Sequence, residues 1–425
     1  MLSLHLPFEE FRLANGLTVI LHRDTSVPVV AVEVMYHVGS KNEHPGRTGL
    51  AHLFEHLMFK GSAHVPDGEH FRRLQAVGAH VNGTTSEDRT NYYAVVPAEH
   101  APLPLFLEAD RMGHLLPALT QEKLDNQRDV VKNERRQSYD NQPYGRASET
   151  IAAALFPPDH PYSWPVIGSM SDLSAATLDD VRDFFRQYYA PNNACLVVAG
   201  NFDDGAIRRA IDEYFGPIPA GAPVAVPRPG PPSLGTETVL QLPDNVHLPR
   251  LYLAWHSAPW HTQEDAVLDV LTDVLSAGKN SRLYRALVLE QQIAQSVIAY
   301  QHGLECAGKL IIQITARPGH TPQELYDSTG KEIERILADG PDGAEIRKSL
   351  NAKESDFFHG LEGMLRRADS LATYATLTGT AANLLHALER FHGISALQVG
   401  DTARSILTRS SVRLDVVSRT TGTEA

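Results

Sequence analysis

Residues 216–235 read GPIPAGAPVAVPRPGPPSLG, and this stretch divides the chain into two halves. Seven of its twenty residues are proline and four are glycine, so neither a helix nor a central strand can continue through it. We interpret it as a semi-rigid linker between a domain at 1–215 and a domain at 236–425. The length of 425 residues also favours two domains, because a single core rarely grows beyond about 250–300 residues.

The two halves begin alike. Alternating segments rich in β-branched residues open each half, GLTVILHRDTSVPVVAVEVMYHVGS at 16–40 and RLYLAWHSAPW at 250–260. Helix-period runs follow, among them 176–189 and 265–275, and strand-like ACLVVAGNF and KLIIQITA come later. This order predicts a duplicated α+β unit of roughly 200 residues, with helices packed on one face of a sheet.

The composition excludes several classes of protein. With 42% hydrophobic and 21% charged residues, the chain has no apolar run of about 18 residues that could span a bilayer. A net charge of −13 disfavours nucleic acid as a partner and favours cationic peptides. Cys195 and Cys306 are far apart, which argues against a disulfide framework or a thiolate zinc site. The start, MLSLHLPFEEFRL, lacks the features of a secretory signal, so we expect a cytoplasmic location, although a removed leader would leave no trace.

The stretch GLAHLFEHLMFKGS at 49–62 places two histidines and a glutamate on one turn of an otherwise apolar helix. His52 and His56 are four residues apart, so they share a helix face at the spacing with which two imidazoles reach one metal ion. Glu55 is placed to approach a metal-bound water instead of the metal. Taken alone, this H-x-x-E-H pattern also fits two surface histidines on an amphipathic helix.

A second predicted helix, residues 120–140, supplies a further candidate ligand. Five of its residues repeat at 3-4-3-4 spacing: Leu124, Gln127, Val131, Glu134 and Ser138. We therefore expect Glu134 on a buried stripe, where a carboxylate requires a cation. That cation is either a metal ion or one of the neighbouring arginines, Arg128, Arg135 or Arg136.

With H-x-x-E-H in this order and 77 residues between His56 and Glu134, the sequence resembles the pitrilysin/insulinase-like inverzincin peptidases, including the mitochondrial processing peptidase branch. In that family a glutamate at a similar distance is the third zinc ligand. The resemblance extends from NGLTVILHRD at 15–24 through 160–202, and more weakly through the second half. It implies two homologous domains, each a mostly antiparallel sheet with helices on one face, which face each other as half of a clamshell chamber.

The resemblance also implies a zinc peptidase site. One Zn²⁺ per chain is held by His52, His56 and Glu134, and the ion lowers the pKa of bound water towards about 7 and polarises a peptide carbonyl. Glu55 is the catalytic base, which takes the water proton and later delivers it to the leaving amine. Gln127 stands where much of the family has a second glutamate that supports the site. An amide can still hydrogen-bond a ligand, but it carries no charge.

The stretch GAHVNGTTSEDRTNYYAVVP at 78–97 permits two interpretations. On pattern alone, Asn82-Gly83 is a hairpin turn. The resemblance instead implies an edge strand beside the zinc, to which an extended peptide adds as a further strand. We favour the edge strand, with Asn82, Gly83 and Thr84 binding substrate, Asn82 nearest the scissile bond, and Gly83 allowing close approach of the substrate backbone.

The second half has no H-x-x-E-H motif. In single-chain active relatives this half supplies an arginine and, seven residues later, a tyrosine that stabilise the tetrahedral intermediate. Aligning SRLYRALVLEQQIAQSVIAY puts Val288 and Gln295 at those positions, and neither replaces such donors. Arg367 and Tyr374 are also seven apart, but they come too late in the chain, and we treat them as a coincidence on an ordinary helix.

The missing pair implies that the chain is the zinc-bearing subunit of a heterodimer, in which a paralogous non-zinc subunit supplies the arginine and tyrosine. The alternatives are a self-sufficient homodimeric oligopeptidase, a non-enzymatic scaffold subunit and a purely structural zinc site. The substrates would be unfolded peptides, with acidic chamber walls favouring basic ones. We expect the other histidines to be surface or core residues instead of ligands: His44, His64, His70, His80 and His100.

Overall fold

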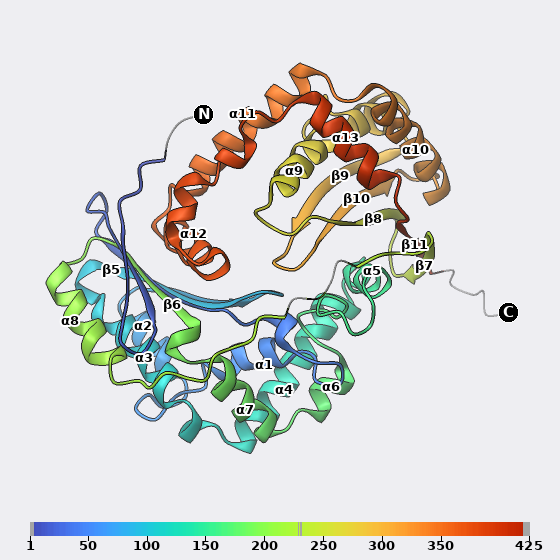
Figure 1. Ribbon diagram of the computed structural model, residues 1–425. Helices are drawn as coiled ribbons and strands as arrows, with labels where there is room; N and C mark the ends of the chain where they lie inside the picture. The colour runs from blue at the N-terminus through green and yellow to red at the C-terminus, as the bar shows by residue number, and fades with distance from the viewer. Residues whose placement is uncertain (1–3, 228, 230–231, 420–425) are drawn as a thin grey trace.

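The computed structural model describes residues 4–227, 229 and 232–419, and its two lobes are each built on one sheet (Figure 1). The sheet of the first half has the order β1 (Glu9–Arg12), β2 (Thr18–Arg23), β6 (Ala194–Gly200), β3 (Val29–Tyr36), β5 (Thr90–Pro97), β4 (His80–Thr85). The sheet of the second half has the order β7 (Thr238–Asp244), β11 (Val412–Ser418), β8 (Arg250–Ser257), β10 (Gly308–Ala316), β9 (Ala294–Gly303). Only β2–β6 and β7–β11 are parallel among these pairs. The predicted fold class is therefore confirmed.

One face of each sheet carries a layer of helices. In the first half these are α1 (Leu50–Leu57), α2 (Glu69–Ala76), α3 (Pro102–His114), α4 (Gln121–Arg135), α6 (Met170–Ala175), α7 (Leu178–Tyr188) and α8 (Asp204–Phe215). In the second half they are α9 (Gln263–Ser276), α10 (Pro322–Asp339), α11 (Gly343–Gly360) and α13 (Ala396–Leu407). The expected helices at 176–189 and 265–275 correspond to α7 and α9.

Local sequence explains how these layers pack. In β3, Val30, Val32 and Val34 face the helical layer, while Ala31 and Met35 face the other side of the sheet, as the two-residue period of a strand requires. In α7 the Thr177 side chain caps the first turn, and the buried residues recur on one stripe: Val181, Phe184, Phe185 and Tyr188.

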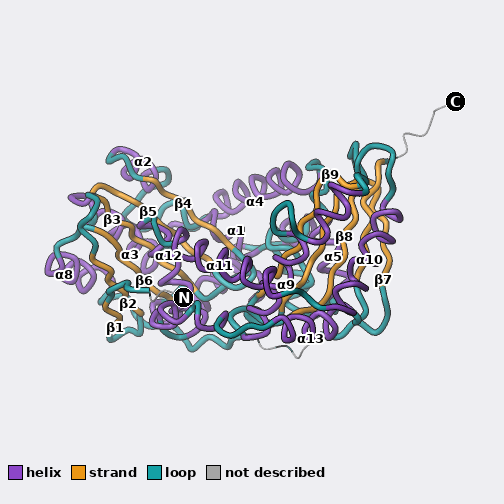
Figure 2. The backbone as a smooth tube through the Cα atoms, turned by 90° about the horizontal axis from the view of Figure 1, so that it is seen from above, coloured by secondary structure: helices purple, strands orange, loops and turns teal. Residues whose placement is uncertain are grey.

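The other face of each sheet is covered by one helix from the opposite half. Helix α12 (Met364–Thr378) packs on β3 and β6, where Ala368 and Leu371 join the cluster that contains Met35 and Val197. Helix α5 (Ala147–Leu155) packs on β8 and β11. Figure 1 shows α12 over the first sheet and α5 beside the second, and in the perpendicular view the two groups of strands lie towards opposite ends of the molecule (Figure 2). Each half therefore completes the packing of the other.

The halves also meet at a buried ion cluster, which we call the Lys41 cluster. Lys41 Nζ contacts Glu305 and lies 3.2 Å from Asp88 Oδ1, and the Lys41 side chain is fully buried. Glu305 also pairs with His37 Nε2 at 2.7 Å, and Tyr162 donates its hydroxyl to Asp88 at 2.6 Å. Asp88 lies in the turn between β4 and β5 and Glu305 in the turn between β9 and β10, so the cluster joins a hairpin of each half.

The stretch between α8 and β7 has neither helix nor strand in its described residues, and residues 228, 230 and 231 of the expected linker lie outside the description. The domain boundaries at 215 and 236 stay a prediction. Cys195 is buried and Cys306 is half-buried, and both are free thiols. None of the described helices combines the length and the apolar character needed to cross a bilayer.

Candidate active site

Helix α1 is held at its start by the buried carboxyl group of Glu43. Gly49 precedes the helix with φ of 85°, and Glu43 accepts hydrogen bonds from the backbone N–H groups of Gly49 at 2.9 Å and Ala51 at 2.7 Å. Burial raises the pKa of Glu43 to about 8, against the lowering effect of these N–H groups. Sequence reasoning missed Glu43, because a cap that comes from outside the helix follows no fixed spacing.

The apolar face of α1 is buried as predicted, through Leu50, Leu53, Phe54, Leu57 and Met58. The opposite face presents His52, Glu55 and His56, which are partly exposed. The two imidazole rings meet edge to face, with centroids 4.8 Å apart. Burial and the neighbouring His56 lower the pKa of His52 to about 4, so His52 is neutral near pH 7 and keeps a lone pair for a metal ion.

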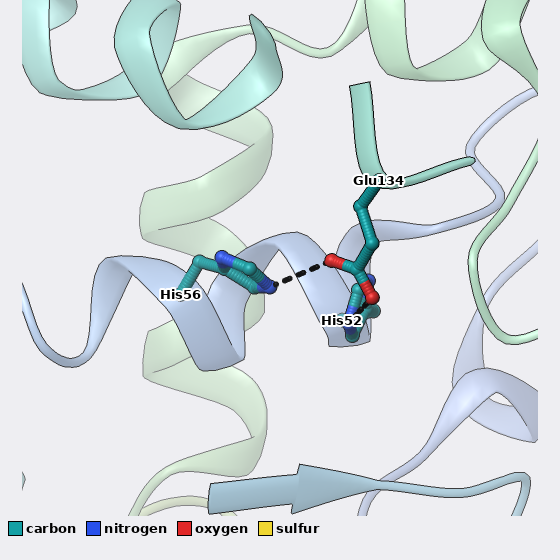
Figure 3. A group of neighbouring side chains, drawn as sticks. All are labelled: His52, His56 and Glu134. Carbon is teal, nitrogen blue, oxygen red and sulfur yellow. Dashed lines mark ion pairs between the residues drawn. The ribbon is translucent and has the colours of Figure 1, made fainter. Parts of the chain in front are cut away.

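Glu134 of α4 lies over both imidazoles (Figure 3). Its Oε1 is 3.7 Å from His52 Nε2 and its Oε2 is 3.4 Å from His56 Nε2. In a tetrahedral zinc site with bonds of about 2.0–2.1 Å, neighbouring ligand atoms are roughly 3.3 Å apart. Two imidazoles and one carboxylate are also a donor set of zinc enzymes, with the fourth position open. The trio therefore fits a zinc ion.

The expected buried stripe of α4 is correct only in part. Leu124, Gln127 and Val131 are buried, but the side chain of Glu134 is 40% exposed and Ser138 is exposed. The reason is that α4 ends at Arg135 and a π-helical turn, Arg136–Asp140, continues the chain beyond the core.

The neighbouring arginines have other partners. Arg128 pairs with Asp125, Arg135 with Glu149, and Arg136 bonds the side chain of Asn133. Glu134 contacts the two histidines instead, and the hydrogen bond with His56 lowers the pKa of Glu134.

Glu55 does not join the ligand trio but faces β4. Thr85 Oγ1 donates a hydrogen bond to Glu55 Oε2 at 2.5 Å. Burial raises the pKa of Glu55, and the Thr85 hydroxyl partly offsets that rise. A carboxylate held beside a metal site, but not in it, is placed to accept a proton. Sequence reasoning missed Thr85, because only the packing of β4 against α1 brings it next to Glu55.

Strand β4 is the edge of the first sheet and pairs only with β5 among the described strands. Asn82 lies opposite Tyr93 and Gly83 opposite Tyr92. The hairpin interpretation of Asn82-Gly83 is therefore wrong, because the turn comes later, where Ser86 N donates to Arg89 O at 2.9 Å. The interpretation as an edge strand is confirmed.

Gly83 has a packing role that the sequence did not indicate. A Cβ at this position would come within 3.0 Å of a Tyr92 ring carbon and 3.2 Å of a Phe59 ring carbon, so the missing side chain makes room for these rings beneath the strand. Asn82 is exposed, and Thr84 Oγ1 donates to Asn91 Oδ1 at 2.6 Å.

Gln127 belongs to the same helix as Glu134, but its side chain does not hydrogen-bond to the zinc trio. It is 3% exposed, and its amide donates to Asn126 Oδ1 at 2.6 Å. The buried Nδ1 of His52 has no hydrogen-bond partner, although metal-binding histidines usually donate this proton to a carboxylate or a carbonyl. In this structure Gln127 does not supply that acceptor.

None of the four positions considered in the second half has a described contact with the zinc trio. Val288 is 6% exposed in the core of that half, and Gln295 is exposed on the edge strand β9. Arg367 pairs with Asp24, and Tyr374 packs against Trp260 and His261. These two residues belong to α12, which is no ordinary helix, since it covers the sheet of the other half.

Among the other histidines, His44 and His80 are exposed, His70 is buried and His100 is half-buried. His64 differs from the expectation, because it lies with Asp110 and His114 in a second group of potential ligands.

Comparison with known proteins gives consistent matches along the chain. Residues 18–160 match the family model described as Insulinase (Peptidase family M16), and residues 175–353 match that of the Peptidase M16 inactive domain. The zinc protease PqqE of Helicobacter pylori is 30% identical over 379 residues, which cover 87% of this chain and 84% of that protein. The zinc protease YmxG of Bacillus subtilis is 24% identical over 401 residues, which cover 94% and 96%. The crystal structure of a protease from Helicobacter pylori aligns with a TM-score of 0.89 at 26% identity, over 97% of this chain and all of that one.

Proposed function

Because the chain belongs to peptidase family M16, the insulinase family, we propose that it is a zinc-dependent endopeptidase subunit that hydrolyses unfolded peptides. The observation that carries the proposal is the convergence of His52, His56 and Glu134 from two helices, with Glu55 held beside them by Thr85. A purely structural zinc site would need no such base, and Glu55 has no other polar partner than Thr85 among its described hydrogen bonds.

The chemistry divides between the ion and the residues of the chain. When bound, zinc supplies a Lewis acid that polarises the peptide carbonyl and makes water more acidic. Glu55 takes a proton from the attacking water and passes it to the nitrogen of the leaving amine as the C–N bond breaks. Thr85 orients the Glu55 carboxylate, and Glu134 adds the negative charge that makes the ligand set favourable for a divalent cation.

Strand β4 is the proposed substrate-binding element. Its outer edge is unpaired among the described strands, so an extended peptide can add to it through main-chain hydrogen bonds, largely independent of its sequence. Asn82 and Thr84 would contribute polar contacts, and Gly83 main-chain groups. The net charge of −13 favours encounter with basic peptides.

The second half gives the reason to propose a partner. The side chain of Val288 is enclosed in the core, so it cannot contact a substrate, and Gln295 offers only a neutral amide. Loss of donors to an oxyanion commonly costs about 10²–10³ in rate. We propose that a paralogous non-zinc subunit supplies an arginine and a tyrosine, and that one catalytic zinc is bound per chain.

The test is hydrolysis of fluorogenic oligopeptides by the zinc-loaded chain, alone and mixed with a paralogous non-zinc subunit. Glu55→Gln serves as the blank for contaminating peptidases, and Glu122→Gln, on the exposed part of α4, is the matched control. Activity only in the mixture supports the divided site. Strong activity from the chain alone favours the homodimeric oligopeptidase, and a zinc-loaded mixture without activity favours a scaffold subunit.

A further inference from the structure

A second group of potential metal ligands lies outside the site described above. His64, Asp110 and His114 each offer one ligand atom, and these atoms all lie within 4.8 Å of one another. They line a cavity of about 260 Å³, whose wall also includes Glu213 and Tyr214 of α8. We propose that this His64 cluster is a second metal site, which binds Zn²⁺ or a similar borderline divalent cation.

The protein positions these side chains without help from an ion. Asp110 and His114 are four residues apart in the last turns of α3, so they lie on one face of the helix. His64 belongs to the loop after α1, and this loop is tied to α3 at several points. Ser62 Oγ donates to Asp110, Ala63 N donates to the carbonyl of His114 at 2.9 Å, and His64 N donates to Asp110 at 3.3 Å. A metal ion would therefore find its ligands close together and would need only a local adjustment of the His64 side chain, at little entropic cost.

The donor set selects the class of metal. Two imidazoles and a carboxylate suit Zn²⁺, Co²⁺, Ni²⁺ and Cu²⁺ much better than Ca²⁺ or Mg²⁺, which prefer oxygen ligands. The side chain of Asp110 is only 3% exposed, whereas that of His64 is 63% exposed. The cluster thus combines a buried charge with imidazoles that solvent ions can reach.

His64 Nδ1 and Asp110 Oδ1 are 2.5 Å apart and share a hydrogen bond. In the bound state the cation takes the place of the proton between them, and that proton passes to solvent. The two atoms must then separate to roughly 3.3 Å, the distance between neighbouring ligands of a tetrahedral ion. Since His64 is largely exposed, its ring has room to turn. The ring of His114 meets that of His64 edge to face at 5.1 Å, which leaves it close enough to complete the trio.

This site is separate from the proposed catalytic one, because its ligands come from α3 and the loop after α1, whereas the catalytic trio comes from α1 and α4. A bound ion would tie the 61–65 loop more firmly to α3. The inference does not rest on peptidase activity, and it revises the expectation that His64 is an ordinary surface histidine.

Equilibrium dialysis of the full chain against Zn²⁺, followed by metal analysis, tests the proposal. We expect two ions for the wild type, one for His64→Ala/His114→Ala and one for His52→Ala/His56→Ala. The control His44→Ala/His392→Ala, which removes two exposed histidines, should keep two. A His64→Ala/His114→Ala variant that binds as many ions as the wild type overturns the proposal.

A second measurement uses Co²⁺ on the His52→Ala/His56→Ala background, where the absorption of bound cobalt reports the second site alone. We expect a cobalt spectrum that disappears when His64→Gln and His114→Gln are added, since glutamine keeps the size of the side chains and removes the imidazoles. The same spectrum with both histidines replaced would place the cobalt elsewhere and overturn the assignment. If zinc is lost when His52 and His56 are replaced but not when His64 and His114 are replaced, the second site is disproved and the proposed peptidase function stands.

Discussion

The Lys41 cluster should contribute strongly to stability, and Lys41→Met tests this. The substitution keeps most of the volume of the side chain but removes the ammonium group that lies between Asp88 and Glu305. Lys41 is 1% exposed and Asp88 is 4% exposed, so water cannot replace the lost charge without opening the contact between the two halves.

The magnitude follows from what the carboxylates retain. Removal of one partner from a buried ion pair typically costs about 3–5 kcal/mol. Asp88 would keep the hydroxyl of Tyr162 and the backbone N–H of Glu305 at 2.9 Å, and Glu305 would keep His37. These remaining partners favour the lower end of the range, so we expect a loss of about 3 kcal/mol.

Urea denaturation at pH 7, followed by tryptophan fluorescence and circular dichroism, measures the change. Lys279→Met, at an exposed lysine, is the control and should change stability by less than about 0.5 kcal/mol. Adding Glu305→Gln to Lys41→Met should recover part of the loss, because it removes one of the two carboxylates that no longer have the ammonium group between them. A Lys41→Met protein within about 1 kcal/mol of the wild type would refute this reasoning, since exposed ion pairs are worth no more than that.

Three further predictions concern single side chains. Gly83→Ala should destabilise the fold by about 1–3 kcal/mol, because its Cβ overlaps the rings of Tyr92 and Phe59. Gly330 lies in α10, where a new Cβ would meet nothing within 4 Å beyond the neighbouring backbone of its own helix, so Gly330→Ala should stabilise the fold by about 0.5–1 kcal/mol. Equal effects of the two substitutions in urea denaturation would contradict the packing argument. For Glu305, burial pushes the pKa up, but the hydrogen bond of His37 and the charge of Lys41 outweigh it and hold the pKa at about 2, below the ordinary 4.5. Its stabilising contribution is therefore present above pH 4.5 and lost as the pH falls to 2. Over that interval the free energy of unfolding of the wild type should fall by about 3 kcal/mol more than that of Glu305→Gln. Parallel curves of unfolding free energy against pH would contradict this prediction. Thr85→Val should keep zinc and lower kcat/KM about tenfold to a hundredfold, which corresponds to the loss of a hydrogen bond to a charged group. Thr85→Ser, which keeps the hydroxyl, should stay near wild type. Wild-type kinetics in Thr85→Val would show that the hydroxyl does not position Glu55.

The parts of the site that follow a local period were predictable. The spacing of His52 and His56 alone placed both imidazoles on one face of a helix, and the apolar residues of α1 indicated its buried face. The contribution of Glu134 depended on the resemblance, since no local rule relates two side chains on different helices with 77 residues between His56 and Glu134. Glu134 was predicted to be buried but is partly exposed, because the helical spacing of residues does not show where a helix extends beyond the core.

Other features depend on contacts between distant segments. Nothing in the pattern of α12 distinguishes a helix that covers its own sheet from one that covers the sheet of the other half. The same holds for Glu43, whose carboxyl group caps α1 from outside the helix. Asn82-Gly83 has the local features of a hairpin turn, but Gly83 is required there by Tyr92 and Phe59, which belong to other elements.

The most direct test of the central claim compares zinc content and peptide hydrolysis in the wild type, Glu55→Gln and Glu134→Gln, each measured with the paralogous subunit present. We expect that Glu55→Gln binds zinc as the wild type does and loses hydrolysis by about 10²–10⁴-fold, whereas Glu134→Gln loses zinc. A Glu55→Gln protein that cleaves peptides at the wild-type rate would contradict the assignment of Glu55 as the catalytic base, and with it the proposed mechanism.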